Sequence, residues 1–108
     1  MKRGSLVPVA VQGDYGKPRP ALVIQSDHFE DHATVTVLLL SSTLIDAPLL
    51  RATVHPDDRN GLKTASQIMI DKAMTLGRER FGTPFGMVSD QLMLEVSRLL
   101  AVFLGVAR

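Results

Sequence analysis

The chain has 108 residues, of which 45% are hydrophobic and 21% are charged, and its formal net charge is +1. These proportions are typical of an ordinary globular protein, and we expect residues 1–108 to form a single domain. The balanced charge excludes the broad basic field of a general nucleic-acid coating protein, so any nucleic acid would be bound by a few placed side chains. The absence of cysteine excludes disulfides, thiolate catalysis and cysteine-based metal sites.

Two segments bear on membrane insertion and export. The longest apolar stretch near the end, Leu99 to Ala107, is too short to span a bilayer. Met1 to Gly4 is not followed by an apolar region of signal-peptide length. We therefore expect a cytoplasmic protein with no membrane partner.

Short strands are predicted to follow one another along most of the chain. Their apolar and β-branched residues, separated by turn formers, predict strands over residues 6–11, 21–25, 34–40, 50–54 and 64–74. Pro8 indicates an edge or a bulge in the first of these strands. Ile68 and Ile70 are expected to point to one face of the last.

Helical periodicity is confined to the C-terminal segment. One stripe of this helix would comprise Leu92, Val96, Leu99, Leu100 and Phe103. Ser89 is the expected N-cap, Asp90 lies in the first turn, and Gly105 is expected to end the helix. Five or six short strands followed by one helix predict a mainly β fold with α (α+β), in which the helix packs on a strongly curved sheet or barrel.

The segment Gly16 to Val23, with the sequence GKPRPALV, is the most informative in the chain. Lys17 and Arg19 each precede a proline, which holds the backbone around Arg19 stiff and extended. A guanidinium at the edge of a strand is then pre-organised to bind phosphate, because its five donors form a fixed fork. The alternative is that Arg19 is a solvated loop cation.

Four blocks of sequence resemble, in order, the MazF/PemK family of toxin–antitoxin ribonucleases. They are Lys2 to Gly4 before an apolar strand, Gly16 to Gln25, Leu39 to Ser42, and Gly61-Leu62 with Ser66 to Lys72 and Thr75. A terminal amphipathic helix ending in Leu104-Gly105 completes the resemblance. It implies an SH3-like small β-barrel with a C-terminal helix, as in MazF and CcdB, and a homodimer.

The same resemblance implies the toxin of a type II toxin–antitoxin system. Its activity would be that of a sequence-specific, metal-independent endoribonuclease that cleaves single-stranded RNA or mRNA to a 2′,3′-cyclic phosphate and a 5′-hydroxyl. No cofactor and no metal is expected. The implied partners are the RNA substrate and a cognate antitoxin whose disordered tail covers the groove around Arg19.

The resemblance also implies which residues are catalytic. Such a ribonuclease needs charge stabilisation at phosphorus, a base for the 2′-hydroxyl and a proton for the leaving oxygen. Arg19 would be the central cation, Ser41 would hydrogen-bond the scissile phosphate, and Asp14 matches an acidic position that some members use. Arginine holds its proton too tightly to be an easy acid, so the proton donor stays open. Ser41 and Asp14 could instead be turn residues.

Four further residues are expected to bind RNA: Lys17, Tyr15, Ser42 and Asp71. Tyr15 could stack on a base or cover an edge of the core. Asp71 could instead be the buried partner of an arginine such as Arg80.

Three positions depart from the family pattern. Ser5 stands where aspartate is usual, which is expected to alter a local contact rather than the chemistry, and Ser41 replaces a more common threonine. Met69 stands where one branch of the family has an arginine, so Arg19 must supply the cation. Base specificity is expected in the loops 13–18 and 44–59.

Two alternative functions follow from these observations. One is a CcdB-like DNA-gyrase inhibitor with the same fold, although that branch ends in Trp-Gly-Ile and this chain has no tryptophan. The other is a catalytically degenerate relative that binds RNA or antitoxin without cleaving.

Overall fold

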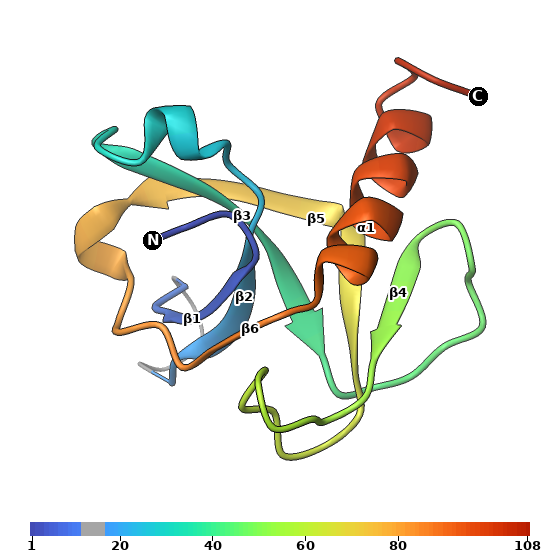
Figure 1. Cartoon of the computed structure of the whole chain (residues 1–108), viewed down its shortest axis with the longest axis horizontal. Coiled ribbons are helices and arrows are strands. Elements are labelled where there is room, and N and C mark those ends of the chain that lie inside the picture. Colours follow the sequence, from blue (N-terminus) through green and yellow to red (C-terminus); the bar gives the residue numbers. More distant parts are fainter. Residues whose placement is uncertain (12–16) are drawn as a thin grey trace.

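The structure is a computed structural model, and it describes residues 1–11 and 17–108 (Figure 1). Apart from two short 3-10 helices, η1 (Asp27–Phe29) and η2 (Arg78–Arg80), the described residues form strands, one helix and loops. The strands and the helix are β1 (Ser5–Val9), β2 (Arg19–Val23), β3 (Thr34–Ser41), β4 (Arg51–Val54), β5 (Ser66–Gly77), β6 (Gly86–Met87) and α1 (Asp90–Phe103).

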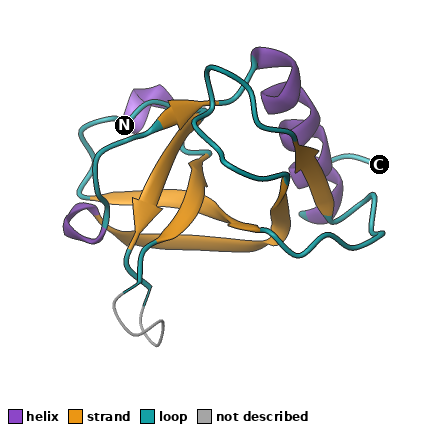
Figure 2. Cartoon of the chain, turned by 90° about the horizontal axis from the view of Figure 1, so that it is seen from below, coloured by secondary structure: helices purple, strands orange, loops and turns teal. Residues whose placement is uncertain are grey.

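All six strands belong to one antiparallel sheet, in the order β4-β5-β3-β2-β1-β6. The sheet is strongly curled, and α1 packs at one side of it, beside β4 and β5 (Figures 1 and 2). The predicted mainly β fold with a C-terminal helix is therefore confirmed, and the described strands form a half-barrel.

Strand β5 produces much of the curl. Its first residues, 66–69, pair with β4, and its pairing with β3 runs through residues 67–68 and then through residues 73–77. Between these two stretches the β3–β5 register shifts, from the pair Leu38 and Ala73 to the pair Leu40 and Ile68. A bulge of this kind bends a strand and increases its twist. The bend lets a single strand serve both sides of the half-barrel.

The sheet buries apolar side chains on both faces, as the period-2 pattern of its strands requires. The face beneath α1 is built mainly from larger aliphatic side chains: Leu6, Leu22, Leu38, Leu40, Ile68 and Ile70. The opposite face carries mainly smaller ones: Val7, Val9, Ala21, Val23, Val35, Val37, Leu39 and Met69. Ile68 and Ile70 share one face, as predicted.

The helix begins and ends where the sequence indicates. Ser89 Oγ accepts a hydrogen bond from the backbone N–H of Leu92 (3.1 Å). At the other end Gly105 has φ +77°, and the N–H of Val106 donates to the carbonyl of Ala101 (2.9 Å). This left-handed glycine cap satisfies carbonyls that the last turn leaves without intrahelical partners.

The predicted apolar stripe of α1 packs on the sheet over most of its length. Val96 and Leu99 are buried, and Leu92 and Leu100 pack against the same cluster. Phe103, the last residue of the stripe, is 50% exposed. It lies in the last turn before the cap.

Strand boundaries differ from the predictions by a few residues. Strand β5 continues to Gly77 instead of ending at residue 74, because its second half pairs with β3 along its whole length. The predicted range 6–11 begins at Ser5 and ends at Val9 in the structure. Strand β6 is not among the predicted strands, because two residues are too few to show a periodicity. It is defined by its pairing with Ser5 and Leu6.

Candidate active site

The candidate site lies where the β2–β3 ladder stops. The two strands pair from Val23 and Val37 to Ala21 and Leu39, and no further. The next residue of β2 is Pro20, which has no N–H to donate. Backbone N–H groups that are an even number of residues apart point to the same side of a strand. Ile24, four residues after Pro20, donates its N–H to the carbonyl of Thr36 in β3, so the nitrogen of Pro20 faces β3 as well. The missing donor explains why the strands separate here.

A surface hollow of about 780 Å³ opens at this separation. It brings together three of the predicted residues, Arg19 at the start of β2, Ser41 at the end of β3, and Ser42 just beyond. The remaining lining residues come from both prolines around Arg19 and from the segments that close the hollow: Pro18, Pro20, Leu40, Thr43, Gly61, Leu62, Lys63, Thr64, Ser66 and Phe85.

Ser41 takes part in a local turn at the rim of this hollow. Its Oγ accepts a hydrogen bond from the N–H of Thr43 (3.1 Å). This is the side chain-to-backbone bond that the turn interpretation of Ser41 predicts. The hydroxyl also approaches the carbonyl oxygen of Thr43 as a donor, at 3.5 Å. This distance is at the long end of the hydrogen-bond range, so the hydroxyl proton is available to a ligand in the hollow.

The loop after Ser42 is anchored by Gln67, a residue that the sequence analysis did not single out. Gln67 is buried, and its side-chain amide bonds both backbone groups of Ile45: Oε1 accepts the N–H and Nε2 donates to the carbonyl, each at 3.0 Å. Nε2 also donates to Thr53 Oγ1 (3.2 Å). Because Ile45 itself is 46% exposed, this amide rather than apolar burial holds the loop.

The other predicted site residues are placed differently. Lys17 is exposed and does not line the hollow. Asp14 and Tyr15 lie outside the described residues. Asp71 forms an ion pair with Arg51, with Asp71 Oδ1 and Arg51 Nη1 3.0 Å apart, and is not among the lining residues.

The arginine that pairs with Asp71 is therefore Arg51 and not Arg80, whose Nε donates to the carbonyl of Ala10 (3.0 Å). Asp71 lies on the irregular stretch of β5 between its two pairing segments, and Arg51 opens the neighbouring strand β4. Both side chains are largely buried, with 25% of Asp71 and 13% of Arg51 exposed.

Two positions that depart from the family pattern lie away from the hollow. Met69 is buried in the core, on the face of the sheet opposite α1, and it does not line the hollow. Ser5 is buried at the start of β1, opposite Met87 of β6. The expectation that Ser5 affects a local contact rather than the chemistry stays a prediction that its position supports.

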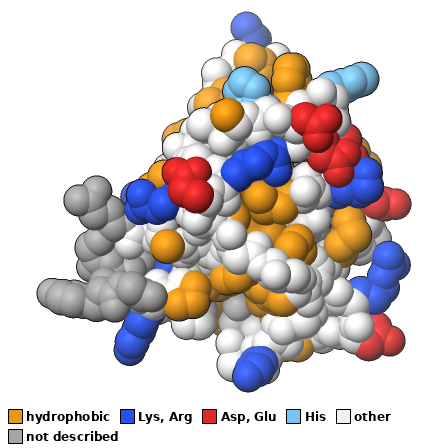
Figure 3. Space-filling view, turned by 90° about the vertical axis from the view of Figure 1, so that its left-hand side faces the viewer, with side chains coloured by type: hydrophobic (Ala, Val, Ile, Leu, Met, Phe, Trp, Pro, Cys, Tyr) orange, Lys and Arg blue, Asp and Glu red, His pale blue; other side chains and the backbone are white. Residues whose placement is uncertain are grey.

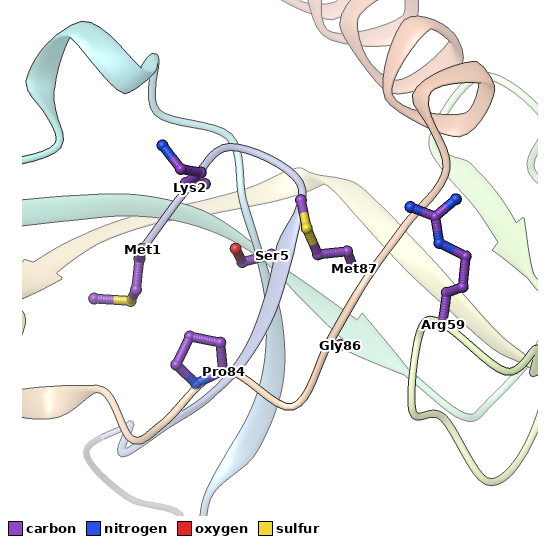
Figure 4. Close-up of a pocket in the computed structure, with 7 residues that line it drawn as sticks. All are labelled: Met1, Lys2, Ser5, Arg59, Pro84, Gly86 and Met87. Atoms are coloured by element: carbon purple, nitrogen blue, oxygen red, sulfur yellow. The ribbon is translucent and has the colours of Figure 1, made fainter.

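A second hollow, of about 610 Å³, lies on the other side of the segment 84–87. Figure 4 shows its labelled side chains, with Met1 and Pro84 on one side and Arg59 on the other, beyond Met87. Its lining includes two methionines, Met1 and Met87, and, of the three positions that depart from the family pattern, it contains Ser5. None of the described residues that line it is a predicted catalytic or RNA-binding residue.

Lys63 and Phe85 line the first hollow and were missed by the sequence analysis. Lys63 lies on the loop before β5, and Phe85 directly precedes β6. Both are distant in sequence from Arg19, and a lone lysine or phenylalanine carries no local signal of a site. Only the tertiary structure shows that they face the same space.

Charges of both signs lie on the face of the molecule that Figure 3 shows. Figure 3 shows apolar side chains interspersed with both Lys or Arg and Asp or Glu side chains on one face. Within residues 1–11 and 17–108, no cluster of three or more His, Cys, Asp and Glu side chains is arranged to hold a metal ion. The one helix described, α1, does not reach the length and hydropathy needed to cross a membrane.

Comparison with known proteins agrees with this architecture. Residues 2–104 match the family described as PemK-like, MazF-like toxin of type II toxin–antitoxin system. A Mycolicibacterium smegmatis protein named "Probable endoribonuclease MazF" is 43% identical over 108 residues, which covers 99% of each chain.

Solved structures share the fold. An endoribonuclease from a mycobacterial species, in complex with its cognate antitoxin, superposes with a TM-score of 0.84 at 23% identity, covering 100% of this chain and 98% of the other. The Mycobacterium tuberculosis toxin MazF-mt6 gives a TM-score of 0.80 at 18% identity, covering 94% and 96%. With the family match over nearly the whole sequence, the chain belongs to the PemK-like, MazF-like toxins of type II toxin–antitoxin systems.

Proposed function

We propose that this toxin is a sequence-specific, metal-independent endoribonuclease that cleaves single-stranded RNA in the hollow lined by Arg19 and Ser41. The observation that carries the proposal is the meeting of these two side chains, from different strands, where Pro20 ends the β2–β3 ladder. The 43% identical relative named as an endoribonuclease supports the reaction class.

The reaction uses the nucleophile that RNA itself provides. The 2′-oxygen attacks the adjacent phosphorus, and the bond from phosphorus to the 5′-oxygen breaks. The 2′-hydroxyl loses its proton to a base, and the leaving 5′-oxygen gains one. The products are a 2′,3′-cyclic phosphate and a 5′-hydroxyl, and neither step requires a metal ion or a cofactor.

Each proposed residue answers one need of this reaction. Arg19 stabilises the charge that develops on the phosphoryl oxygens, and Ser41 and Ser42 donate hydrogen bonds that position the phosphate. Asp14, five positions before Arg19 in the chain, is the proposed base. Lys17 and Tyr15 are proposed to bind RNA beside it, and the RNA contact of Asp71 stays a separate prediction.

The proposal includes the partners of such a toxin. A solved relative is a complex of an endoribonuclease with its cognate antitoxin. We infer a cognate antitoxin for this chain too, with a segment that covers the hollow and blocks Arg19. A homodimer of single-domain chains acting in the cytoplasm, where mRNA is found, completes the proposal.

DNA-gyrase inhibition is not favoured, because the family match and the named relative both indicate the ribonuclease branch. A degenerate toxin that binds RNA without cleaving is the second outcome that the experiment must separate.

The first test is cleavage of a long unstructured RNA by purified protein in excess EDTA, with cut sites mapped by primer extension. Arg19→Ala is expected to lower kcat by at least about 100-fold, since removing one charge-stabilising donor typically costs that much. The matched control is Arg98→Ala, which removes an exposed arginine from α1 outside the hollow and should cleave like the unaltered protein.

Discrete cuts at a recurring short motif, lost in Arg19→Ala and kept in Arg98→Ala, would support the proposal. Cleavage by a folded Arg19→Ala protein at the normal rate would contradict the role of Arg19. Intact RNA with the unaltered protein would contradict the activity itself.

A further inference from the structure

The lining of the active-site hollow combines two kinds of side chain. Cations and hydroxyls come from Arg19, Ser41, Ser42, Thr43, Lys63, Thr64 and Ser66. Apolar side chains come from Pro18, Pro20, Leu40, Leu62 and Phe85. A nucleotide combines the same two properties, because its phosphate is anionic and its base is a flat, largely apolar ring. Phe85 is the one aromatic side chain among the described residues that line the hollow.

Phe85 is held in place by its backbone. Its N–H donates to the carbonyl of Leu6 in β1 (2.9 Å), and the next residue, Gly86, pairs with Leu6 in the sheet. Pro84 and Gly86, on either side, line the second hollow, whereas Phe85 lines the first. Pairing with β1 therefore fixes which way this side chain points.

Gly61 makes room for the ring. It has φ +69°, and a Cβ at this position would come 2.5 Å from the carbonyl oxygen of Phe85 and 3.2 Å from its Cδ1. The ring edge thus lies over bare backbone, in a conformation that glycine tolerates best. Phe85 is nevertheless 41% exposed, so a large part of its surface is not buried in the core and is accessible from the hollow that it lines.

We propose that Phe85 is the stacking platform for an RNA base next to the scissile phosphate. This inference rests on the proposed function, since it places the base beside the phosphate that Arg19 binds. Stacking on an aromatic ring is available to every base, and it would fix the orientation of the nucleotide while polar groups of the loops discriminate among bases.

The chain has no tryptophan, so Phe85→Trp creates a single fluorescent reporter at this position. The probes are homopolymeric oligodeoxynucleotides of about twelve nucleotides, a length within the usual range of single-strand sites. They lack the 2′-hydroxyl and cannot be cleaved. An abasic oligomer of the same length and charge tests phosphate binding alone. The control is Phe29→Trp, which places the reporter on η1, exposed and outside the hollow.

Saturable quenching of the Phe85→Trp emission by at least one oligomer with bases, and not by the abasic one, is the expected result. The Phe29→Trp emission should not change. Absence of quenching, or equal quenching by the abasic oligomer, would overturn the stacking role.

A second measurement needs no tryptophan. Phe85→Leu is expected to raise KM for RNA about tenfold, within the range that loss of one base–aromatic stack produces, whereas Phe85→Tyr keeps the ring and should restore it. Thermal unfolding midpoints of both variants should match that of the unaltered protein. An unchanged KM in Phe85→Leu would overturn the proposal.

The two proposals fail in different ways. Quenching by bases in a protein that cleaves no RNA would contradict the ribonuclease activity and support the platform. Motif-specific cleavage without quenching, and with normal kinetics in Phe85→Leu, would support the activity and overturn the platform.

Discussion

Arg19 occupies its place because of its two neighbours. Pro18 and Pro20 restrict the backbone on both sides of it, so little conformational entropy is lost when the guanidinium binds a phosphate. The same clamp contributes to the wall, since both prolines line the hollow beside Arg19. At the scale of single residues, the local sequence therefore builds both the cation and part of its surroundings.

Asp71, one of the predicted RNA-binding residues, forms an ion pair with Arg51 and does not line the hollow. Its carboxylate lies 3.0 Å from Arg51 Nη1, which also donates to the carbonyl of Leu50 (3.1 Å). Removing one partner of a largely buried pair leaves the other charge uncompensated, which costs more than the pair contributes when intact.

Asp71→Asn therefore separates the two interpretations of this residue. The free energy of unfolding is expected to fall by about 1–3 kcal/mol, with kcat/KM for RNA unchanged, because a neutral amide oxygen replaces the charged acceptor and leaves the charge of Arg51 uncompensated. Denaturant unfolding and RNA cleavage are measured side by side, with Asp31→Asn, an exposed carboxylate shortly after η1, as the control. Reduced cleavage at unchanged stability would instead establish an RNA contact at Asp71.

At the scale of elements, the hollow is a consequence of strand pairing. Strands β2 and β3 part at Pro20, and β3 pairs with β5 through Leu40 and Ser41. Pro8 lies directly opposite Pro20 in β1 but faces away from β2, since its carbonyl accepts the N–H of Gly82 (2.9 Å). The two prolines therefore cost the β1–β2 ladder no hydrogen bond.

Pro20→Val tests whether the missing N–H keeps the hollow open. Valine supplies a donor that faces β3, so the ladder is expected to extend toward Leu40 and narrow the space beside Arg19. We expect kcat/KM to fall by about tenfold or more, because small displacements of reacting groups are costly. Thermal stability should hold, since a new ladder bond of about 1 kcal/mol offsets the lost proline rigidity.

Pro8→Val is the matched control, because it adds an N–H on the side away from β2 and the hollow. It should leave cleavage unchanged. Normal cleavage by Pro20→Val would show that the hollow does not depend on the proline.

At the scale of the whole molecule, the near-neutral charge limits how RNA can be held. The net charge is +1, and Arg19 and Lys63 are the cations among the described lining residues. A single strand releases about 0.7 counterions per neutralised phosphate, so few contacts mean a weak dependence on salt.

Affinity for an RNA with a 2′-deoxy nucleotide at the cleavage site is therefore expected to fall gently with salt. Two phosphate contacts, from Arg19 and Lys63, predict a slope of about −1.4 in a plot of log K against log salt concentration, and a third contact from Lys17 would make it about −2.1. Fluorescence anisotropy over a series of NaCl concentrations gives this slope. A slope steeper than about −4 would indicate an extended basic track and contradict binding through a few placed residues.

The amino-acid sequence by itself determined the order of strands β1 to β5 and of helix α1, the two ends of α1, and Arg19 as a residue of interest, whereas Ser41 was singled out by the family resemblance. These depend on local chemistry: alternation of apolar residues, a serine N-cap, a glycine with positive φ, and a cation between prolines. The exposure of Phe103 could not be predicted, because an apolar periodicity does not show where the sheet beneath a helix ends.

Only the tertiary structure decided what shares the hollow with Arg19. Lys63 and Phe85 reach it through the loop before β5 and the pairing of β6 with β1, and Gln67 positions the loop after Ser42 through a buried amide. Asp71 is engaged by Arg51 because the bend in β5 places it beside β4. Such contacts join residues far apart in the chain, and their geometry depends on strand register, which local patterns leave open.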